Sequence, residues 1–464
     1  MDRGKVDRGK VAGPARTRAT ILGLALAMLA TLVGAACTET VQRAATSPAP
    51  TAPTGDTIPS TAPDGPVIED YAGQEASFGT VPDEAVEADG TPIRVGMINQ
   101  EDTPLGSFPE LRLAVEAGIE WINTELGGVD GHPLELDACI TNFSVERSQA
   151  CAQQMVGDDV VAVLGGIDIT SNGSIPVLEQ NDLPYVGGIP INIDEERSPI
   201  SFQFTGGTPG AFAAFAWFAA EELEAQRIAV VYADFPPIQT AAQDYGVAVA
   251  RNFGVDDVHE VAFGLSTTDF LPVLQEANQG DPDAILIGAA DTTCVPAMQG
   301  ARDLAITAKV FLVGACAAPS IIAEAGPAAS EGRIFNIEGR LEAEEASTNG
   351  VDGALYNLAV LKYGDGLAPA GAGTVSFRGL MNLYAVMTRI GAEDLTSQAI
   401  IDDLRASVDT PSFNGHPYTC ATPQVPDLPS LCAPEQVLVE QRDGALVEVS
   451  DGWVDVPQIL AAGD

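Results

Sequence analysis

The chain has 464 residues, of which 46% are hydrophobic, so it can bury a large core and is long enough for more than one lobe. Lys and Arg number 22 against 65 Asp and Glu, which gives a formal net charge of −43. A surface this acidic repels nucleic acid and anionic lipid, and it argues against both as binding partners. The carboxylates are spread along the chain, so the acidity belongs to the folded surface and not to a tail.

The first 36 residues have the pattern of a signal peptide for export. A basic region, residues 3–18, precedes the apolar stretch 21–36, which is short for a membrane span and ends in small residues. Cys37 follows at once. This junction resembles a bacterial lipoprotein signal, in which the Cys thiol is acylated and becomes the mature N-terminus. We therefore expect lipidation of Cys37 and a location on the outer face of the bacterial cell membrane. An ordinary secretory signal cleaved near Ala36 is the alternative.

Residues 37–91 are poor in large apolar side chains and rich in Pro, Thr, Ala and acids, as in the stretch TSPAPTAPTGDTIPSTAPDG. Such a composition buries too little surface to offset the entropy of folding. We predict a disordered tether between the lipid site and the folded part of the chain.

Residues 92–205 alternate between strand and helix patterns and form the first part of lobe 1. An apolar strand at 93–99 is followed by a turn-rich loop at 100–107 and a helix at 109–126. Further strands are predicted at 134–140, 160–166 and 183–188, and further helices at 145–156 and 170–181. This alternation predicts a parallel sheet with helices on both faces.

The alternation restarts in residues 206–336, which form the first part of lobe 2. Helices are predicted at 209–224, 240–254, 269–279 and 292–304, and strands at 227–234, 258–263, 283–290 and 308–315. Residues 337–410 then return to lobe 1 as helices, and residues 411–464 return to lobe 2 with strands that turn at two Asp-Gly pairs. The predicted fold class is α/β, with two doubly wound parallel-sheet lobes joined by a hinge of several crossings. Sheets of this kind bind ligands at the carboxyl ends of their strands.

The chain has seven cysteines, and assigning Cys37 to lipid leaves six, an even number in an exported chain. Six cysteines permit 15 connectivities. Their grouping along the chain favours three local pairs, Cys139–Cys151, Cys294–Cys316 and Cys420–Cys432. A metal cluster is disfavoured because CxxC does not occur and the three histidines are scattered, so we expect neither a metal nor a cofactor.

Residues 160–174, VVAVLGGIDITSNGS, join an apolar strand to a Gly-containing polar loop, a pattern that can hold phosphate. Neither GxGxxG nor GxxxxGK[ST] occurs here, and no Lys or Arg lies between Arg147 and Arg197. GxSxG and HExxH are also absent. These observations disfavour nucleotide binding and nominate no catalytic residue, so we expect a binding protein and not an enzyme.

The order of elements resembles the type I solute-binding proteins of ABC importers, in the group that binds leucine, isoleucine and valine. The resemblance runs from about residue 91 to about residue 456. It rests on the segments IRVGMINQ, FPELRLAVEAGIEWINTELGGVDGHPLELDAC, VVAVLGG, LPYVGG and RIAVVYADF. It implies a type I periplasmic-binding fold that captures a small-molecule ligand between two lobes, acts as a monomer, and delivers the ligand to permease and ATPase subunits.

In that family the ligand carboxylate rests on hydroxyls and backbone N–H groups in the loop after the third strand, at a helix N-terminus. The next loop offers backbone groups and a hydroxyl, and the first loop supplies apolar wall contacts. The loop at 187–192 has no Ser or Thr, so Asn192 or the backbone would have to serve there. The resemblance therefore implies ligand contacts in lobe 1 from Asp168, Thr170, Ser171, Asn172, Gly188, Ile189, Asn192, Leu105 and Phe108.

Lobe 2 departs from the family pattern. Where the family commonly places an acid that holds the ligand's ammonium group, this chain has Cys316 and Ala317. Asp291 is the nearest alternative acid, although it could equally cap the helix that follows. Phe235 stands where an aromatic residue often covers the ligand, although it could instead pack locally. Amino acids, amides and other small carboxylates all remain candidate ligands, and a ligand-sensing receptor module is the alternative function.

Overall fold

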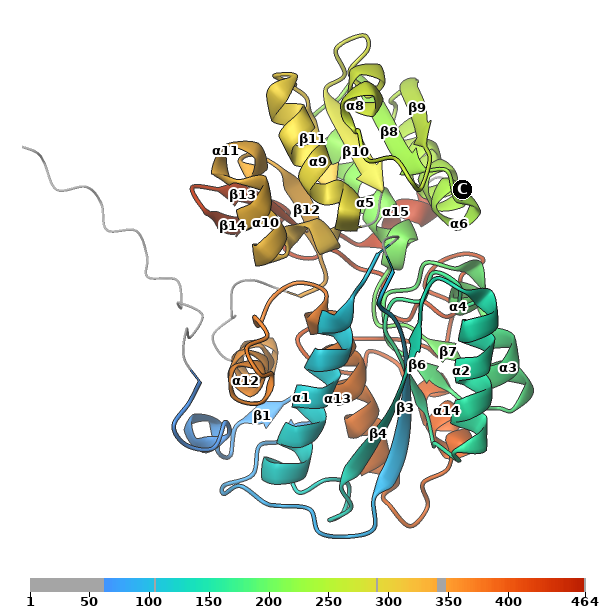
Figure 1. Cartoon of the computed structure of the whole chain (residues 1–464), viewed down its shortest axis with the longest axis vertical. Helices are drawn as coiled ribbons and strands as arrows, with labels where there is room; N and C mark the ends of the chain where they lie inside the picture. The colour runs from blue at the N-terminus through green and yellow to red at the C-terminus, as the bar shows by residue number, and fades with distance from the viewer. Residues whose placement is uncertain (1–61, 104–105, 289–290, 340–347, 463–464) are drawn as a thin grey trace, which may run out of the picture. The chain divides into compact units, whose positions relative to one another are not determined.

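The computed structural model describes residues 62–103, 106–288, 291–339 and 348–462, which form two lobes, each built on one parallel sheet (Figure 1). The predicted α/β class with two parallel-sheet lobes is confirmed. The signal peptide at 1–36 and Cys37 lie outside the described residues. Among the helices of the described ranges, none is long and apolar enough to span a membrane.

The sheet of lobe 1 has the strand order β4-β3-β5-β6-β7, and all neighbouring strands are parallel. Its strands are β3 (Ile93–Gln100), β4 (Leu134–Thr141), β5 (Val163–Gly165), β6 (Tyr185–Val186) and β7 (Ser201–Phe202). From β3 the chain continues to β4 on one side, and from β4 it crosses past β3 to β5 on the other side. The strand order therefore reverses direction between β3 and β5, and open α/β sheets bind ligands at the carboxyl ends of strands beside such a point.

Helices from two distant parts of the sequence cover the sheet of lobe 1 (Figure 1). They are α1 (Pro109–Glu125), α2 (Val145–Gly157), α3 (Ile175–Gln180), α4 (Ile193–Arg197), α12 (Thr348–Tyr363), α13 (Gly373–Ile390) and α14 (Ser397–Arg405). The helices α12 and α13 pack against α1, so the predicted return of the chain to lobe 1 is observed.

The sheet of lobe 2 has the order β14-β13-β12-β11-β10-β8-β9. Its parallel strands are β8 (Arg227–Ala233), β9 (Asp257–Phe263), β10 (Ala284–Gly288), β11 (Lys309–Leu312) and β12 (Ile334–Ile337). The strands β13 (Val437–Arg442) and β14 (Ala445–Glu448) extend it antiparallel and meet at the predicted Asp443-Gly444 turn. The order β9-β8-β10-β11-β12 repeats that of lobe 1, with the corresponding reversal between β8 and β10.

The helices of lobe 2 are α5 (Gly207–Glu221), α6 (Pro236–Ala241), α7 (Ala248–Asn252), α8 (Leu271–Ala277), α9 (Asp291–Asp303), α10 (Pro319–Ala325), α11 (Pro327–Ser330) and α15 (Val456–Ala461). Helices are observed at the four predicted positions of lobe 2, one of them interrupted, and three short helices, α10, α11 and α15, were not predicted. The single helix predicted at 240–254 is divided, because a π-helical turn at Ala242–Val247 separates α6 from α7.

The tether prediction is wrong for the described part of residues 37–91. Residues 62–91 form a packed segment on lobe 1 that includes the short strands β1 (Glu75–Ala76) and β2 (Gly79–Thr80). Its few apolar residues are enough to anchor it, since Val67 and Ile68 are buried and the Phe78 ring contacts Trp121. The remainder of the predicted tether, 37–61, lies outside the described residues.

The predicted domain boundary at residue 411 is also wrong. Residues 411–433 stay with lobe 1, because Phe413, Tyr418 and Cys432 belong to its hydrophobic core. Leu431 also pairs with Gln203 beyond the end of β7. The chain crosses to lobe 2 only at Pro434, immediately before β13.

The three predicted disulfides are confirmed, as Cys139–Cys151, Cys294–Cys316 and Cys420–Cys432. The first joins β4 to α2 in lobe 1. The second joins α9 to the 3-10 turn Gly314–Ala317 after β11 in lobe 2. These two disulfides therefore fix connections close to the carboxyl edges of their sheets, while the third lies within residues 411–433.

Candidate functional site

Three loops meet at the carboxyl edge of the lobe 1 sheet, after β3, β5 and β6. The side chain of Asn99, near the end of β3, connects the first two loops: Oδ1 accepts a hydrogen bond from Ile167 N at 3.1 Å, and Nδ2 donates to Phe108 O at 2.8 Å. The loops after β5 and β6 are joined through their backbones, because Ile189 N donates to Gly166 O. The edge is therefore a single connected structure.

Asp168 organises the loop after β5. Its side chain is fully buried, and its carboxylate accepts hydrogen bonds from the backbone and hydroxyl of Thr170 at 3.1 and 2.9 Å. Three further hydroxyls donate to it, those of Thr141 at 3.1 Å, Ser148 at 2.6 Å and Ser174 at 3.5 Å. Burial raises the pKa of Asp168, while these hydrogen bonds oppose the shift. Asp168 thus holds the loop from inside instead of facing a ligand.

The other residues predicted in this loop have different environments. The Thr170 hydroxyl is committed to Asp168, and Asn172 is exposed. Ser171 is fully buried, and its hydroxyl has no hydrogen-bond partner. The predicted helix at 170–181 begins only at Ile175 and has six residues, so its N-terminus starts four residues after Ser171.

The loop after β6 approaches other backbone closely, which explains its two glycines. Gly188 has φ +93°, and a Cβ there would lie 2.7 Å from the carbonyl carbon of Gly165. Gly187 has φ +69°, and a Cβ there would lie 2.7 Å from the Cα of Gly379 on α13. Only glycine allows both the left-handed conformation and these contacts. Ile189, which follows, is half-buried.

Asn192 is the N-cap of α4 and not a free polar group at the edge. Its Oδ1 accepts from Asp194 N at 3.4 Å, and its own N–H donates to the buried Glu195 carboxyl at 3.1 Å. Glu195 also accepts from Ile191 N and from the Tyr185 hydroxyl, at 2.9 and 3.1 Å. Burial raises the pKa of Glu195 to about 8. The capping box of α4 is the one sequence feature that marks Glu195.

The loop after β3 is described except for residues 104–105, so the predicted contact by Leu105 lies outside the described residues. Phe108 is 4% exposed and belongs to the hydrophobic core of lobe 1. It therefore supports the loop after β3 from below and offers little surface to a ligand. The Gln100 amide donates through Nε2 to Gly106 O at 2.9 Å, while its Oε1 is buried without a partner. Glu101 receives two hydrogen bonds from Arg112, at 2.8 and 3.1 Å.

The corresponding edge of lobe 2 is less polar. Phe235 follows β8, and its half-buried ring packs against the hydrophobic core of lobe 1, so it reaches across to the other lobe. Cys316 is buried in its disulfide, and a disulfide sulfur cannot supply the negative charge that the family's acid provides. Asp291 is the first residue of α9, but its side chain lies outside what the structure describes.

Arg378 on α13, which was not among the predicted site residues, joins the crossings between the lobes. Its guanidinium group is 2% exposed and donates to the carbonyls of Phe204, Glu338, Phe413 and Asn414, at 3.3, 2.5, 3.1 and 3.0 Å. Phe204 and Glu338 lie in the first and second crossings. A single Arg within the apolar helical pattern FRGLMNLY was the available signal.

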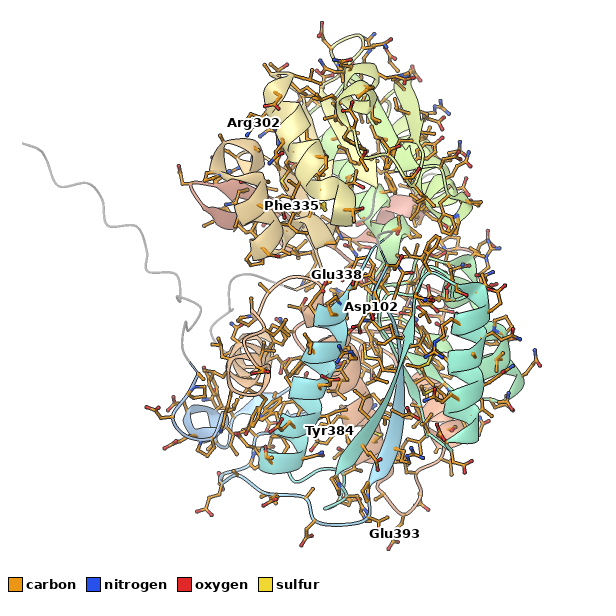
Figure 2. All side chains as sticks on the ribbon, in the orientation of Figure 1. Asp102, Arg302, Phe335, Glu338, Tyr384 and Glu393 are labelled. Atoms are coloured by element: carbon orange, nitrogen blue, oxygen red, sulfur yellow. A yellow bond between two sulfur atoms is a disulfide. The ribbon has the colours of Figure 1, made fainter. Side chains whose placement is uncertain are left out.

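Glu338 continues the hinge network, at the level where the lobes adjoin (Figure 2). Its carboxyl accepts a hydrogen bond from the Thr205 hydroxyl of the first crossing, and burial raises its pKa. Asn336 donates to the Gln436 side chain of the third crossing at 2.8 Å. The three crossings are therefore held together by buried polar side chains.

A hollow of about 410 Å³ lies on lobe 1, and none of the predicted ligand residues is part of its lining. Its lining comes from α3, α4 and the residues after α4: Ile175, Pro176, Glu179, Gln180, Asp194, Arg197, Ser198 and Pro199. Within the described ranges, His, Cys, Asp and Glu form no group of three or more suited to a metal ion. The polar edge of the sheet is thus the better candidate site.

Residues 92–421 match the family model described as periplasmic binding protein. No curated protein matches the chain in sequence. Among solved structures, a leucine-binding protein from Thermotoga maritima is 21% identical, with a TM-score of 0.63 over 77% of this chain and 98% of that one. A branched-chain amino-acid transporter substrate-binding protein from Streptococcus pneumoniae, solved with isoleucine, is 16% identical, with a TM-score of 0.62 over 77% and 100%. A solute-binding protein from R. palustris, solved with 4-hydroxybenzoate, is 18% identical, with a TM-score of 0.63 over 78% and 97%. At these identities the likeness establishes the fold.

Proposed function

Because the chain belongs to the periplasmic binding protein family, we propose that it is the substrate-binding protein of an ABC importer and captures a small polar solute between its two lobes. The observation that carries this proposal is the pair of sheets with the same strand order, joined by crossings that three buried polar side chains hold together. Hinge closure around a ligand is the motion that such an architecture supports. An amino acid or an amide is the proposed solute class.

We place the ligand at the carboxyl edge of the lobe 1 sheet. The Ser171 hydroxyl is the proposed polar contact, since it is buried at this edge without a partner. The N–H group of Gly188 and the carbonyl of Ile189 would add hydrogen bonds, since Ile189 N already donates to Gly166 O, and Phe235 would cover the ligand from lobe 2. Asp168 and Asn192 are assigned to holding the loops, because their side chains are already bonded within lobe 1.

The family implies an extracytoplasmic location. We propose that the protein is anchored there through acylated Cys37, that permease and ATPase subunits receive its ligand, and that it performs no catalysis. Cleavage after Ala36 without acylation would leave a freely diffusing protein. Mass spectrometry of the mature N-terminus distinguishes these two forms.

A thermal-shift panel of amino acids, amides and small carboxylates tests the capture function. A ligand present at 100 times its Kd should add about 2.7 kcal/mol to the free energy of unfolding. The released ligand should be recovered chemically unchanged. A panel without any stabilising solute would contradict the proposal.

Ser171→Ala tests the placement of the ligand. Loss of one hydrogen bond to a ligand should weaken binding by about 1 kcal/mol, roughly fivefold in Kd. Ser330→Ala is the control, because Ser330 is also buried but ends α11 in lobe 2. The helix α11 directly precedes β12 and so lies by the amino end of that strand, away from the carboxyl edge. Equal losses of affinity in both variants would remove Ser171 from the site.

A further inference from the structure

The loops at the carboxyl edge of lobe 1 carry acids and no cations. The loops after β3, β4, β5 and β6 contain no Lys, Arg or His, and they contain Glu101, Asp102 and Asp168. Two cations lie in the helices that follow these loops: Arg112 on α1 is bound to Glu101 and to Glu116 at 2.8 and 2.6 Å, and Arg147 on α2 donates to Ile140 O at 2.9 Å. Figure 2 shows Asp102 at the end of lobe 1 that adjoins lobe 2.

The facing loops of lobe 2 have the same bias. Those after β8, β9, β10 and β11 contain no Lys, Arg or His, and they contain Asp234 and Asp269. Arg340, in the crossing after β12, lies outside the described residues. The overall acidity of the chain accounts for exposed carboxylates such as Asp102 and Asp234. It does not account for a carboxylate that is buried at the ligand edge.

Asp168 is such a carboxylate. It is fully buried, all five of its hydrogen bonds come from hydroxyl or backbone N–H donors, and within the described residues no Lys or Arg forms an ion pair with it. Buried carboxylates are ordinarily matched by a cation or a metal. The edge therefore holds a buried carboxyl group that no described Lys or Arg pairs with, and burial raises its pKa.

The hydrogen bonds of Asp168 also consume the donors that a ligand carboxylate would need. The hydroxyls of Thr141, Ser148, Thr170 and Ser174 all point toward it. The helix α3 begins four residues after Ser171 and has only six residues, so its N-terminal N–H groups lie beyond the loop. A ligand carboxylate here would find few donors and would be repelled by Asp168 if that group is ionised.

Two buried atoms at this edge are unpartnered. The Gln100 amide donates through Nε2 to Gly106 O, which leaves Oε1, an acceptor only, without a partner. The Ser171 hydroxyl can accept or donate a hydrogen bond. Buried polar atoms normally have a hydrogen-bond partner, so a ligand that supplies one to these two atoms would be favoured. An N–H group of a ligand would satisfy the acceptor, whereas a carboxylate could not.

We infer that lobe 1 recognises a nitrogen hydrogen-bond-donor end of its ligand, an amide or an amine, in preference to a carboxylate. The inference rests on the proposed function, because it specifies the ligand chemistry at the same edge. An amine would place a positive charge near the buried Asp168 carboxyl without contacting it, while an amide would only satisfy the unpaired acceptor. The two sources of the same N–H chemistry can therefore be separated experimentally.

The test is isothermal titration of the purified protein with matched compounds: benzamide, benzylamine and benzoate, then leucinamide and N-acetylleucine, beside the solutes that stabilise the protein in the panel above. Each nitrogen donor should bind at least tenfold more tightly than its carboxylate counterpart, the order of effect that one charge exerts at partly buried distances. Binding confined to the carboxylates would overturn the inference and leave the capture function standing. Absence of binding by any compound or panel solute would contradict both.

Asp168→Asn assigns the preference to its source. It should reduce the ratio of amine to carboxylate affinity about tenfold while leaving the ratio of amide to carboxylate less affected. Asp352→Asn is the matched control, because Asp352 is also fully buried but bonds to Ser77 N and Asn414 N on the other side of lobe 1. If Asp168→Asn does not fold, Glu101→Gln should shift the ratio in the same direction by a smaller factor. Unchanged ratios in the folded edge variants would overturn the inference.

Discussion

The two lobes share one strand order but stabilise their carboxyl edges by different means. In lobe 1, buried polar groups hold the loops: Asn99 and Asp168 for the first two, and Glu195 for the third. In lobe 2, the Cys294–Cys316 disulfide and apolar residues such as Phe235 and Ala317 occupy the equivalent positions. The shared topology decides where the edge lies, and the loop residues decide its chemistry.

This difference suggests a division of roles. Buried hydrogen bonds are directional, so the loops of lobe 1 keep a fixed set of donors and acceptors for recognition. Apolar contacts are not directional, so the edge of lobe 2 can cover ligands of different shape. Recognition by lobe 1 and closure by lobe 2 then become separable properties, which mutations can address one at a time.

The largest expected effect is on the polar support that connects lobe 1 to the hinge. Arg378→Ala should lower the free energy of unfolding by about 3–5 kcal/mol, because four buried carbonyls lose their donor. Arg389→Ala on the same helix is the control, since Arg389 is paired with Asp403 near the surface and should cost no more than about 1 kcal/mol. Urea denaturation measures both. Similar losses in the two variants would contradict a special role for the buried arginine.

The next prediction compares the lobes directly through their disulfides. Replacing Cys294 and Cys316 with Ala should cost about 3 kcal/mol, and replacing Cys139 and Cys151 slightly less, because their separations are 22 and 12 residues. Only the lobe 1 change should also alter ligand affinity, since Thr141 and Ser148, which bond to Asp168, lie beside that disulfide. Denaturation and titration calorimetry measure the two effects. An affinity loss confined to the lobe 2 variant would reverse the proposed roles.

The elements of this fold were predictable because their signals are local. The strand at 93–100 and the helix at 109–125 follow from apolar periodicity and a proline at the first helical turn. The segment 62–91 was not predictable from composition, since a few apolar residues such as Ile68 and Phe78 anchor it on a surface formed by distant helices. The boundary at 411 failed for the same reason, because Phe413 and Tyr418 pack into a core that the local sequence does not reveal.

The candidate site shows the same limit at the level of single side chains. The loops after β5 and β6 were predicted correctly as the edge of the sheet, but the orientation of their polar groups was not. Thr170 and Asn192 have suitable chemistry for a ligand, yet each is bonded to a neighbour within lobe 1. Arg378 and Glu195 were missed because their partners are backbone groups, which leave no residue-type signature.

A pH dependence is also expected from the polar edge of lobe 1. The pKa of Glu195 is raised by burial to about 8, so the folded protein holds this proton more tightly than the unfolded chain does. Stability attributable to Glu195 is therefore greatest below about pH 4.5 and falls as the pH rises toward 8. Glu195→Gln should flatten that part of the profile, while Glu120→Gln, at an exposed position on α1, should leave it unchanged. Thermal melts from pH 4.5 to 8.5 measure the slopes, and a Glu195→Gln slope equal to that of the parent protein would show that this carboxyl does not carry the buried proton. Burial also raises the pKa of the neighbouring Glu196 to about 8, so only the difference between the parent and Glu195→Gln slopes reports on Glu195.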